Sequence, residues 1–194
     1  MQPFHAHTGV VAPLARPDID TDQIIPKQFL KRLGRTGYAD ALFFDWRTNG
    51  EPFVLNDPRY AGASILVGGP NFGCGSSREH AVWALHDYGF RVVLAASFAD
   101  IFASNAVANG FLAARIDPAT ATALVAAAEA APGCQVTVDL EACRVTGPDG
   151  IDAPIMVDDR ARQRLLAGLD DIGLILQHDD AIRRYEAAHD AAAR

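Results

Sequence analysis

Hydrophobic residues form three short, nearly continuous runs in the middle of the chain, at residues 65–67, 91–96 and 111–116. Runs of this length, bounded by turn residues, are typical of strands that are buried in a sheet. A stretch with the spacing of a helix follows each run, over residues 77–88, 98–109 and 117–131. Gly89 and Gly110 predict helix ends. The alternation of strands and helices places this region in the α/β class.

The flanking regions follow a different pattern. Residues 8–14 predict a first strand, and short alternating segments from Gln135 onward predict antiparallel strands around a Pro148-Asp149-Gly150 turn. Residues 158–177 predict one helix, or two helices broken at Gly168 or Gly173, before a helical tail over about 178–194 that frays at its end. We therefore expect residues 1–194 to form one layered α/β domain, with a mixed sheet and flanking helices.

The connection between the first strand and residue 65 is rich in turn residues. Residues 18–22 predict a loop, residues 38–46 a short helix and residues 49–62 a series of surface turns. Residues 27–35 carry several cations and run into a stretch with two glycines, Gly34 and Gly37. This combination predicts a mobile loop that meets an anion.

Composition and charge are typical of a globular protein of the cytoplasm. The 194 residues are 49% hydrophobic and 21% charged, and 17 basic against 24 acidic residues give a net charge of −7. This charge argues against a nucleic-acid surface, although a local arginine site can still bind a small anion. The N-terminus lacks the basic and apolar regions of a signal peptide, and no run is long enough to span a membrane.

Cysteine usage argues against a disulfide scaffold and against a metal site within this chain. Cys74, Cys134 and Cys143 are odd in number and include no C-x-x-C pair. We interpret Cys134 and Cys143 as small buried side chains on neighbouring strands.

The clearest chemical signal lies between the strand at residues 65–67 and the helix that follows, in the stretch NFGCGSSREH at residues 71–80. Ser76 and Glu79 have the S-x-x-E spacing of a capping box, which predicts that the helix begins there. Its first turn would offer free backbone N–H groups, the positive end of the helix dipole, two hydroxyls and the Arg78 guanidinium. Together these features predict an anion site.

Spacing excludes three familiar interpretations of this loop. The phosphate-loop pattern fits from Gly68 to Gly73, but Cys74 stands where its lysine is required. The dinucleotide fingerprint fails because Arg78 replaces its third glycine. The hydrolase pattern G-x-S-x-G fails because no glycine follows the serine at the required position.

Three motifs show which family the sequence resembles. NFGCGSSREHA at residues 71–81, DIDTDQIIPK at residues 18–27 and ALFFDWR at residues 41–47 are the stretches that carry the likeness. They closely resemble the small subunits of 3-isopropylmalate dehydratase (isopropylmalate isomerase), which are similar to the swivelling domain of aconitase. The resemblance covers roughly residues 4–175. It implies the layered β/β/α fold of that swivelling domain.

The resemblance also implies catalytic and binding roles. In aconitase-like enzymes the first serine of G-S-S-R acts, as its alkoxide, as the base that removes a proton from the carbon next to a carboxylate, and Ser76 has that place. Ser77 and Arg78 match residues that bind the substrate carboxylate, a task that suits a planar guanidinium. Asp22 matches an active-site aspartate, although an Asx-turn residue would show the same local pattern.

The basic segment after residue 26 is expected to contribute a further substrate-binding cation. The register of the resemblance leaves Arg32 as the best match, with Lys31 and Arg35 as alternatives. The loop from Phe29 to Gly37 is also expected to meet the variable side chain of the substrate, where apolar residues would favour an isopropyl group. The expected members of this specificity loop are Phe29, Leu30, Leu33 and Arg35.

Two other residues beside Ser76 have open roles. His80 either orients the loop or, as we prefer, is a satisfied hydrogen-bonding histidine. Cys74 is usual in the small-subunit family, and it cannot hold an iron–sulfur cluster by itself. An exposed thiol at this position would be open to oxidation.

The implied activity is that of a hydro-lyase in leucine biosynthesis. Water is removed from 2-isopropylmalate and added back with hydroxyl and hydrogen exchanged, through isopropylmaleate. The departing hydroxyl needs a Lewis acid, which family enzymes supply as one iron of a [4Fe-4S] cluster. We expect no cofactor and no metal on this chain, a cluster on a separate large subunit, and activity only in a heterodimer or larger assembly of the two.

Other functions remain open from the sequence. A sister small subunit would act on citraconate and methylmalate, on homoaconitate or on dimethylmalate, and the loop from Phe29 to Gly37 would decide among them. A non-catalytic anion-binding module would use the same helix N-terminus without turnover. A redox sensor built on Cys74 would depend on that thiol.

Overall fold

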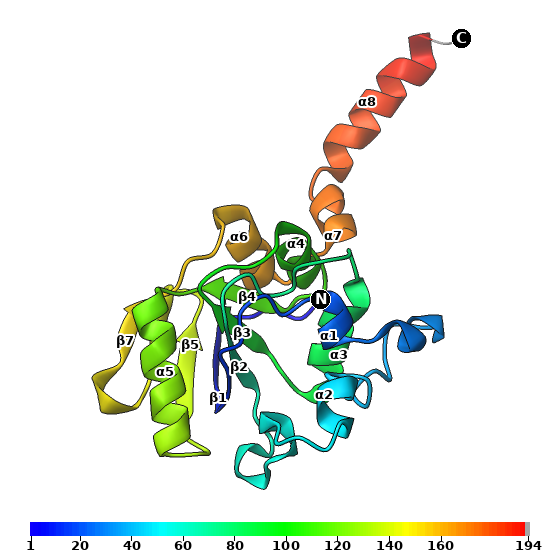
Figure 1. Cartoon of the computed structure of the whole chain (residues 1–194). Coiled ribbons are helices and arrows are strands. Elements are labelled where there is room, and N and C mark those ends of the chain that lie inside the picture. Colours follow the sequence, from blue (N-terminus) through cyan, green and yellow to red (C-terminus); the bar gives the residue numbers. More distant parts are fainter. Residues whose placement is uncertain (193–194) are drawn as a thin grey trace.

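The computed structural model describes residues 1–192 and centres on a seven-stranded mixed sheet (Figure 1). The strands lie in the order β4-β3-β2-β1-β5-β6-β7. Their bounds are β1 Ala6–Leu14, β2 Ile65–Gly68, β3 Val92–Ala95, β4 Leu112–Arg115, β5 Gln135–Asp139, β6 Arg144–Thr146 and β7 Asp152–Pro154. Each lies in or beside a stretch that the hydrophobic pattern predicted as a strand.

Strand β1 joins a parallel half of the sheet to an antiparallel half. It pairs in parallel with β2, and β2, β3 and β4 continue the parallel pairing. On its other edge it pairs antiparallel with β5, which continues through β6 to β7. Parallel strands need long crossover connections, which the helices between them provide, whereas the antiparallel strands are joined by short turns. The predicted α/β class with a mixed sheet is confirmed.

Neighbouring residues of the central strands supply two hydrophobic cores, one on each face of the sheet. Leu66 and Val93 pack with α3 (Glu79–Tyr88) and α4 (Asp100–Ala108). Ile65 and Val92 pack on the other face with α5 (Pro118–Ala130) and α6 (Asp159–Ala167). Because side chains alternate along a strand, a continuous apolar run fills both cores. Figure 1 shows the sheet between α5 on one side and α1 to α3 on the other.

The connection after β1 contains two short α-helices, α1 (Thr21–Ile24) and α2 (Phe44–Thr48), and three 3-10 helices at Lys27–Lys31, Val54–Asn56 and Pro58–Tyr60. The prediction of a loop over residues 18–22 is wrong from Thr21 onward, because Asp20 begins a helix there. An oxygen of Asp20 accepts from the Gln23 N–H at 2.7 Å, and the Gln23 side chain accepts from the Asp20 N–H at 2.9 Å. This is a capping box whose N-cap is aspartate. The short helix predicted over residues 38–46 begins later, at Phe44.

The C-terminal region forms two further helices, α7 (Asp171–Leu176) and α8 (Asp179–Ala192), and α8 projects away from the body (Figure 1). Helix α6 ends at Gly168, so the first of the two predicted breaks is confirmed, whereas Gly173 lies inside α7. No helix among the described residues is long and apolar enough to span a membrane. The predicted fraying at the end of the tail falls on residues 193–194, outside the described residues.

Gly73 allows the loop before α3 to pass close to α4. Its φ is +76°, and an added Cβ would lie 2.3 Å from Cγ of Phe102. Gly73→Ala is therefore expected to lower the free energy of unfolding by about 3 kcal/mol or more, through backbone strain and overpacking. Gly37→Ala is the matched control, since its φ is +90° but no atom lies within 4 Å of the added Cβ. Urea unfolding should show a much smaller loss for the control, and equal losses would mean that the close approach to Phe102 costs nothing.

Candidate active site

The three motifs of the family resemblance meet where the chain leaves β2. Asp20 and Cys74 form a parallel β-bridge, and the Thr21 N–H donates to the Cys74 carbonyl at 2.9 Å. The Phe43 N–H donates to the Ile24 carbonyl at 2.8 Å. Segments that are far apart in the sequence therefore build one surface around residues 74–78.

The predicted capping box of Ser76 and Glu79 is wrong. Helix α3 begins at Glu79 with Arg78 as its N-cap, and Arg78 makes no side-chain cap hydrogen bond. Gly75 has a φ of +85°, and the Thr21 hydroxyl donates to the Ser76 carbonyl at 2.8 Å, so Ser76 is held before the helix. Ser76 and Ser77 are exposed. The N-terminus of α3 therefore keeps its positive end for an anion, and neither serine hydroxyl is used in capping.

Arg78 and Asp22 form an ion pair across 56 residues of sequence. Nη1 of Arg78 donates to Oδ1 of Asp22 at 2.5 Å and to the Ile25 carbonyl at 3.2 Å. The Arg78 side chain is 13% exposed and that of Asp22 is 53% exposed. Nε and Nη2 of Arg78 make no hydrogen bond to another described residue, so one planar edge of the guanidinium can still grip a carboxylate.

Glu79 has a different partner from the predicted one. Its carboxylate accepts from the side-chain amide of Asn109 at 2.9 Å, and the Asn109 oxygen accepts from the Trp83 indole N–H at 2.9 Å. Asn109 thus ties the first turn of α3 to the end of α4. The sequence alone did not point to Asn109, because a polar residue before Gly110 looks like an ordinary helix end.

Thr21 is the buried residue that fixes the position of Ser76. It is 2% exposed, its hydroxyl holds the Ser76 carbonyl and its backbone N–H holds the Cys74 carbonyl. Thr21→Val keeps the shape of the side chain but leaves the Ser76 carbonyl without its donor. We expect it to lower kcat by about tenfold to a hundredfold through misplacement of the loop.

The matched control for this prediction is Thr21→Ser, which keeps the hydroxyl. Steady-state kinetics of the assembled enzyme should show near wild-type kcat for Thr21→Ser and a low kcat with little change in KM for Thr21→Val. Equal losses in the two variants would mean that packing of the threonine methyl, and not the hydrogen bond, is what matters.

The structure places Arg32 in an ion pair of its own. Its guanidinium makes two hydrogen bonds with Asp40, at 2.6 and 2.7 Å, and a third with the Gly37 carbonyl at 2.7 Å. It also lies 4.8 Å over the Phe29 ring. The hydrogen bonds from Arg32 hold the pKa of the Asp40 carboxyl below its usual value. Arg32 therefore braces the loop.

The other residues of the predicted specificity loop differ in exposure. Phe29 and Leu30 are partly buried against the core, whereas Leu33 is 98% exposed at the tip of the loop. The guanidinium of Arg35 lies 5.9 Å over the Trp83 ring of α3. Lys31 is exposed. The apolar tip at Leu33 and the two cations Lys31 and Arg35 are thus the parts of the loop that can reach another molecule.

His80 packs between two aromatic rings, with its ring centre 5.4 Å from that of Tyr38 and 4.5 Å from that of Trp83. Burial lowers the pKa of His80; the Glu79 carboxylate opposes this shift and the Arg78 guanidinium adds to it. The imidazole is therefore neutral at pH 7 and adds no positive charge beside Ser76. This aromatic packing agrees with a structural histidine, but the ring makes no hydrogen bond to another described residue, so the preferred hydrogen-bonding role is not confirmed.

The lowered pKa of His80 predicts how stability depends on pH. Below the unfolded value of about 6.5, the unfolded chain binds a proton that the folded chain resists, so falling pH favours unfolding. The His80→Gln variant should lose less stability than the wild type between pH 7.5 and pH 5.5 in urea unfolding. An unchanged pH dependence would show that His80 takes up its proton equally well in both states.

The three cysteines are free and partly buried, and Cys134 and Cys143 lie just before β5 and β6, so their prediction as buried strand residues is wrong. Burial, with the nearby charges of Asp20 and Asp18, raises the pKa of the Cys74 thiol, which disfavours the reactive thiolate that a redox sensor needs. No group of three or more His, Cys, Asp or Glu side chains among the described residues could hold a metal ion. The donor set of the described residues therefore does not fit an iron–sulfur cluster.

Family models match nearly the whole chain. The family described as the aconitase C-terminal domain matches residues 1–119. The family described as LeuD_N matches residues 122–159, and the family of the C-terminal domain of the 3-isopropylmalate dehydratase small subunit matches residues 171–194.

Individual proteins that are similar to the chain have the same family name. The chain is 58% identical to the 3-isopropylmalate dehydratase small subunit of Koribacter versatilis, over 97% of this chain and 100% of that relative. It is 53% identical to the same subunit of Frankia alni, over 98% of this chain and 97% of the relative. A crystal structure of 3-isopropylmalate dehydratase from Methanocaldococcus jannaschii matches with a TM-score of 0.68 and 24% identity, over 93% of this chain and 99% of that chain, and supports the fold.

Proposed function

The chain belongs to the family of 3-isopropylmalate dehydratase small subunits, and from this we propose that it supplies the proton-transfer half of a two-subunit hydro-lyase. The reaction interconverts 2-isopropylmalate and 3-isopropylmalate through isopropylmaleate, in leucine biosynthesis and in the cytoplasm. The observation that carries this proposal is the pairing of Arg78 with Asp22 beside two exposed serines at an uncapped helix N-terminus.

Ser76 is the proposed base. It removes the proton from the carbon next to a substrate carboxylate and returns a proton when water is added back. A serine hydroxyl is a poor base in water, so its anion needs positive surroundings, which the N-terminus of α3 and the Arg78 guanidinium provide. The Thr21 hydrogen bond to the Ser76 carbonyl keeps the hydroxyl in place without using the hydroxyl itself.

Ser77 and Arg78 are the residues that we propose to bind the substrate carboxylate. Asp22 and the Ile25 carbonyl occupy Nη1 of Arg78, which fixes the plane of the guanidinium and leaves Nε and Nη2 for a bidentate contact. Asp22 thus acts by orienting Arg78. Arg32 can bind substrate only after its ion pair with Asp40 is broken. We therefore propose it as a binding residue that requires a rearrangement of the loop.

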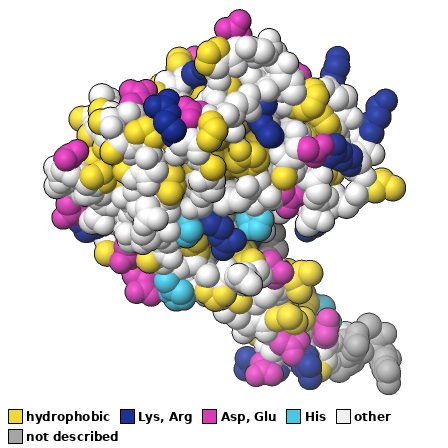
Figure 2. Space-filling view, turned by 90° about the horizontal axis from the view of Figure 1, so that it is seen from below, with side chains coloured by type: hydrophobic (Ala, Val, Ile, Leu, Met, Phe, Trp, Pro, Cys, Tyr) yellow, Lys and Arg dark blue, Asp and Glu magenta, His cyan; other side chains and the backbone are white. Residues whose placement is uncertain are grey.

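The remaining chemistry requires a partner, which we propose is the large subunit of the dehydratase. The described residues do not fit a cluster, and we propose that the [4Fe-4S] cluster belongs to that subunit. Several apolar side chains of this chain are exposed and would suit burial in such an assembly: Leu33, Ile172, Ile175, Leu176 and Tyr185. Figure 2 shows charged side chains of both signs scattered over one face, and hydrophobic and charged side chains together on the projecting tail.

The experiment that tests this function compares substrates on the complex with the large subunit of the same organism, kept anaerobic. We expect kcat/KM for isopropylmaleate hydration to exceed those for citraconate, dimethylmaleate and homoaconitate. Preference for one of these others would assign the chain to a sister hydro-lyase. Carboxylate binding without any turnover, unaffected by Ser76→Ala, would instead indicate an anion-binding module.

A further inference from the structure

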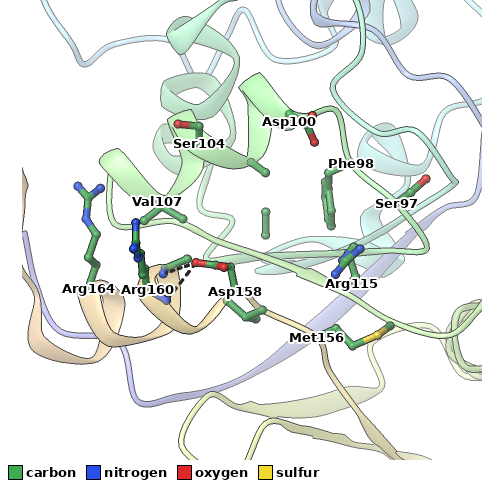
Figure 3. A pocket seen from close by; sticks show the side chains of 14 residues that line it. Ser97, Phe98, Asp100, Ser104, Val107, Arg115, Met156, Asp158, Arg160 and Arg164 are labelled. Atoms are coloured by element: carbon green, nitrogen blue, oxygen red, sulfur yellow. Dashed lines mark hydrogen bonds between the residues drawn. The ribbon is translucent and has the colours of Figure 1, made fainter.

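A cavity of about 510 Å³ lies beyond the carboxyl ends of β3 and β4, between α4 and α6 (Figure 3). Its volume is in the range of small-molecule sites. None of Ser76, Ser77, Arg78, Asp22 or the residues of the specificity loop lines it. It is therefore separate from the candidate active site, and the family resemblance gives it no role.

The lining of this cavity is positively charged on an acidic protein. Its charged lining residues are three arginines, Arg115, Arg160 and Arg164, and two aspartates, Asp100 and Asp158, and Arg164 already has an interaction partner. Oδ1 of Asp158 accepts from the backbone N–H groups of Arg160 and Ala161, at 3.0 and 3.2 Å, so this carboxylate already caps α6. Apart from Arg164 and Asp158, which both have partners, the cavity holds two guanidiniums, of Arg115 and Arg160, and one carboxylate, of Asp100, so the local charge favours an anion.

The backbones of Arg115 and Arg160 are fixed, but their guanidinium groups have no side-chain partner among the described residues. The Arg115 N–H donates to the Met156 carbonyl at 3.0 Å and the Met156 N–H donates back at 2.8 Å, while Arg160 lies in the first turn of α6. Neither guanidinium has a hydrogen bond or ion pair with another side chain that the structure describes. Figure 3 shows them on different walls of the cavity, Arg115 from the sheet and Arg160 from the helix.

The remaining lining residues are two serines, Ser97 and Ser104, and apolar side chains. Phe98 and Val107 line the cavity, and the Phe98 ring is fixed by parallel stacking on Phe102 at 6.1 Å. The Ser97 hydroxyl accepts from the Asn71 N–H at 2.8 Å, and because a hydroxyl both accepts and donates, its proton stays available for a ligand oxygen. The cavity thus combines cationic donors with aliphatic and aromatic side chains.

We propose that this cavity binds a small organic monocarboxylate with a short aliphatic body. The carboxylate takes hydrogen bonds from the Arg115 or Arg160 guanidinium and from Ser97, and the aliphatic part lies on Phe98 and Val107. The Arg115 and Arg160 guanidiniums against the Asp100 carboxylate leave one positive charge to match a single negative charge, whereas a phosphate monoester carries about −1.5 to −2 and exceeds it.

NMR titration of the full small subunit without its partner tests this proposal, with 4-methylpentanoate as probe and the Met156 methyl group as reporter. We expect saturable shifts at Met156, and no such shifts with the neutral 4-methylpentanamide. The Arg115→Gln and Arg160→Gln variants together should weaken binding about tenfold or more. Arg183→Gln on exposed α8 is the matched control and should bind like the wild type.

Three results would overturn the proposal: no saturable shift, equal binding by the amide, or tighter binding of inorganic phosphate. Arg78→Gln separates the cavity from the candidate active site, because it should leave the Met156 shifts unchanged. Loss of these shifts in Arg78→Gln would place the probe at the active site and contradict the second site. Since no large subunit and no turnover are involved, the outcome is independent of the proposed hydro-lyase function.

Discussion

Ser76→Ala is expected to lower kcat of the assembled enzyme by about 10²–10⁴-fold, the range for loss of a general base, while KM changes little. Arg78 and Ser77 still grip the substrate carboxylate in this variant, so binding survives while proton transfer fails. Because Ser76 does not cap α3, the free energy of unfolding should stay within about 0.5 kcal/mol of the wild type. Steady-state kinetics and urea unfolding of the same preparation measure both effects.

Thr122→Ala is the matched control, since it also removes one hydroxyl near the start of a helix, on α5. It should keep wild-type turnover. If Ser76→Ala retains most of its turnover, Ser76 is not the base. If it instead loses several kcal/mol of stability, the hydroxyl has a structural role that its exposed position does not indicate.

Arg78→Lys is expected to lower kcat/KM by about 10²–10³-fold, comparable to the loss of a preorganised charged donor. An ammonium keeps the charge, but it cannot contact Asp22 and the Ile25 carbonyl while presenting a second planar edge to a carboxylate. The variant should lower kcat and raise KM, whereas Ser76→Ala should lower kcat with little change in KM. Arg144→Lys, at an exposed ion pair with Asp152, is the matched control and should be silent.

The role of Asp22 can be separated from that of Arg78 by a double-mutant cycle. Asp22→Asn should reduce kcat/KM in the wild type but much less in Arg78→Lys, because Asp22 acts by orienting the guanidinium. Additive losses would contradict this coupling. They would indicate that Asp22 contacts substrate directly.

The hydrophobic pattern predicted the sheet well because each central strand is buried on both faces. Residues 65–67 and 91–96 contribute to both cores, so a continuous apolar run was a sufficient signal. The motif at residues 71–81 also located the candidate site, since a strand, a glycine-rich turn and a helix follow one another within a few residues. These features are local in sequence, and local patterns predict them.

The remaining features of the site could not be predicted from the sequence, because they depend on contacts between distant segments. Helix α3 begins at Glu79 and not at the predicted Ser76, because the hydroxyl of Thr21, 55 residues earlier, donates to the Ser76 carbonyl. In addition, the Asn109 side-chain amide donates to the Glu79 carboxylate. The pairing of Arg32 with Asp40 was equally hidden, since a basic loop gives no sign of which cation is already neutralised. Residue types predicted what chemistry is available, and only tertiary contacts decide which groups remain free to perform it.

The measurement that tests the central claim most directly is anaerobic hydration of isopropylmaleate by this chain, by a cluster-loaded large subunit of the same organism, and by the two mixed. We expect turnover only in the mixture, and a mixture made with Ser76→Ala that assembles but does not turn over. Turnover by the large subunit alone, or an undiminished rate with Ser76→Ala, would contradict the claim that this chain supplies the base.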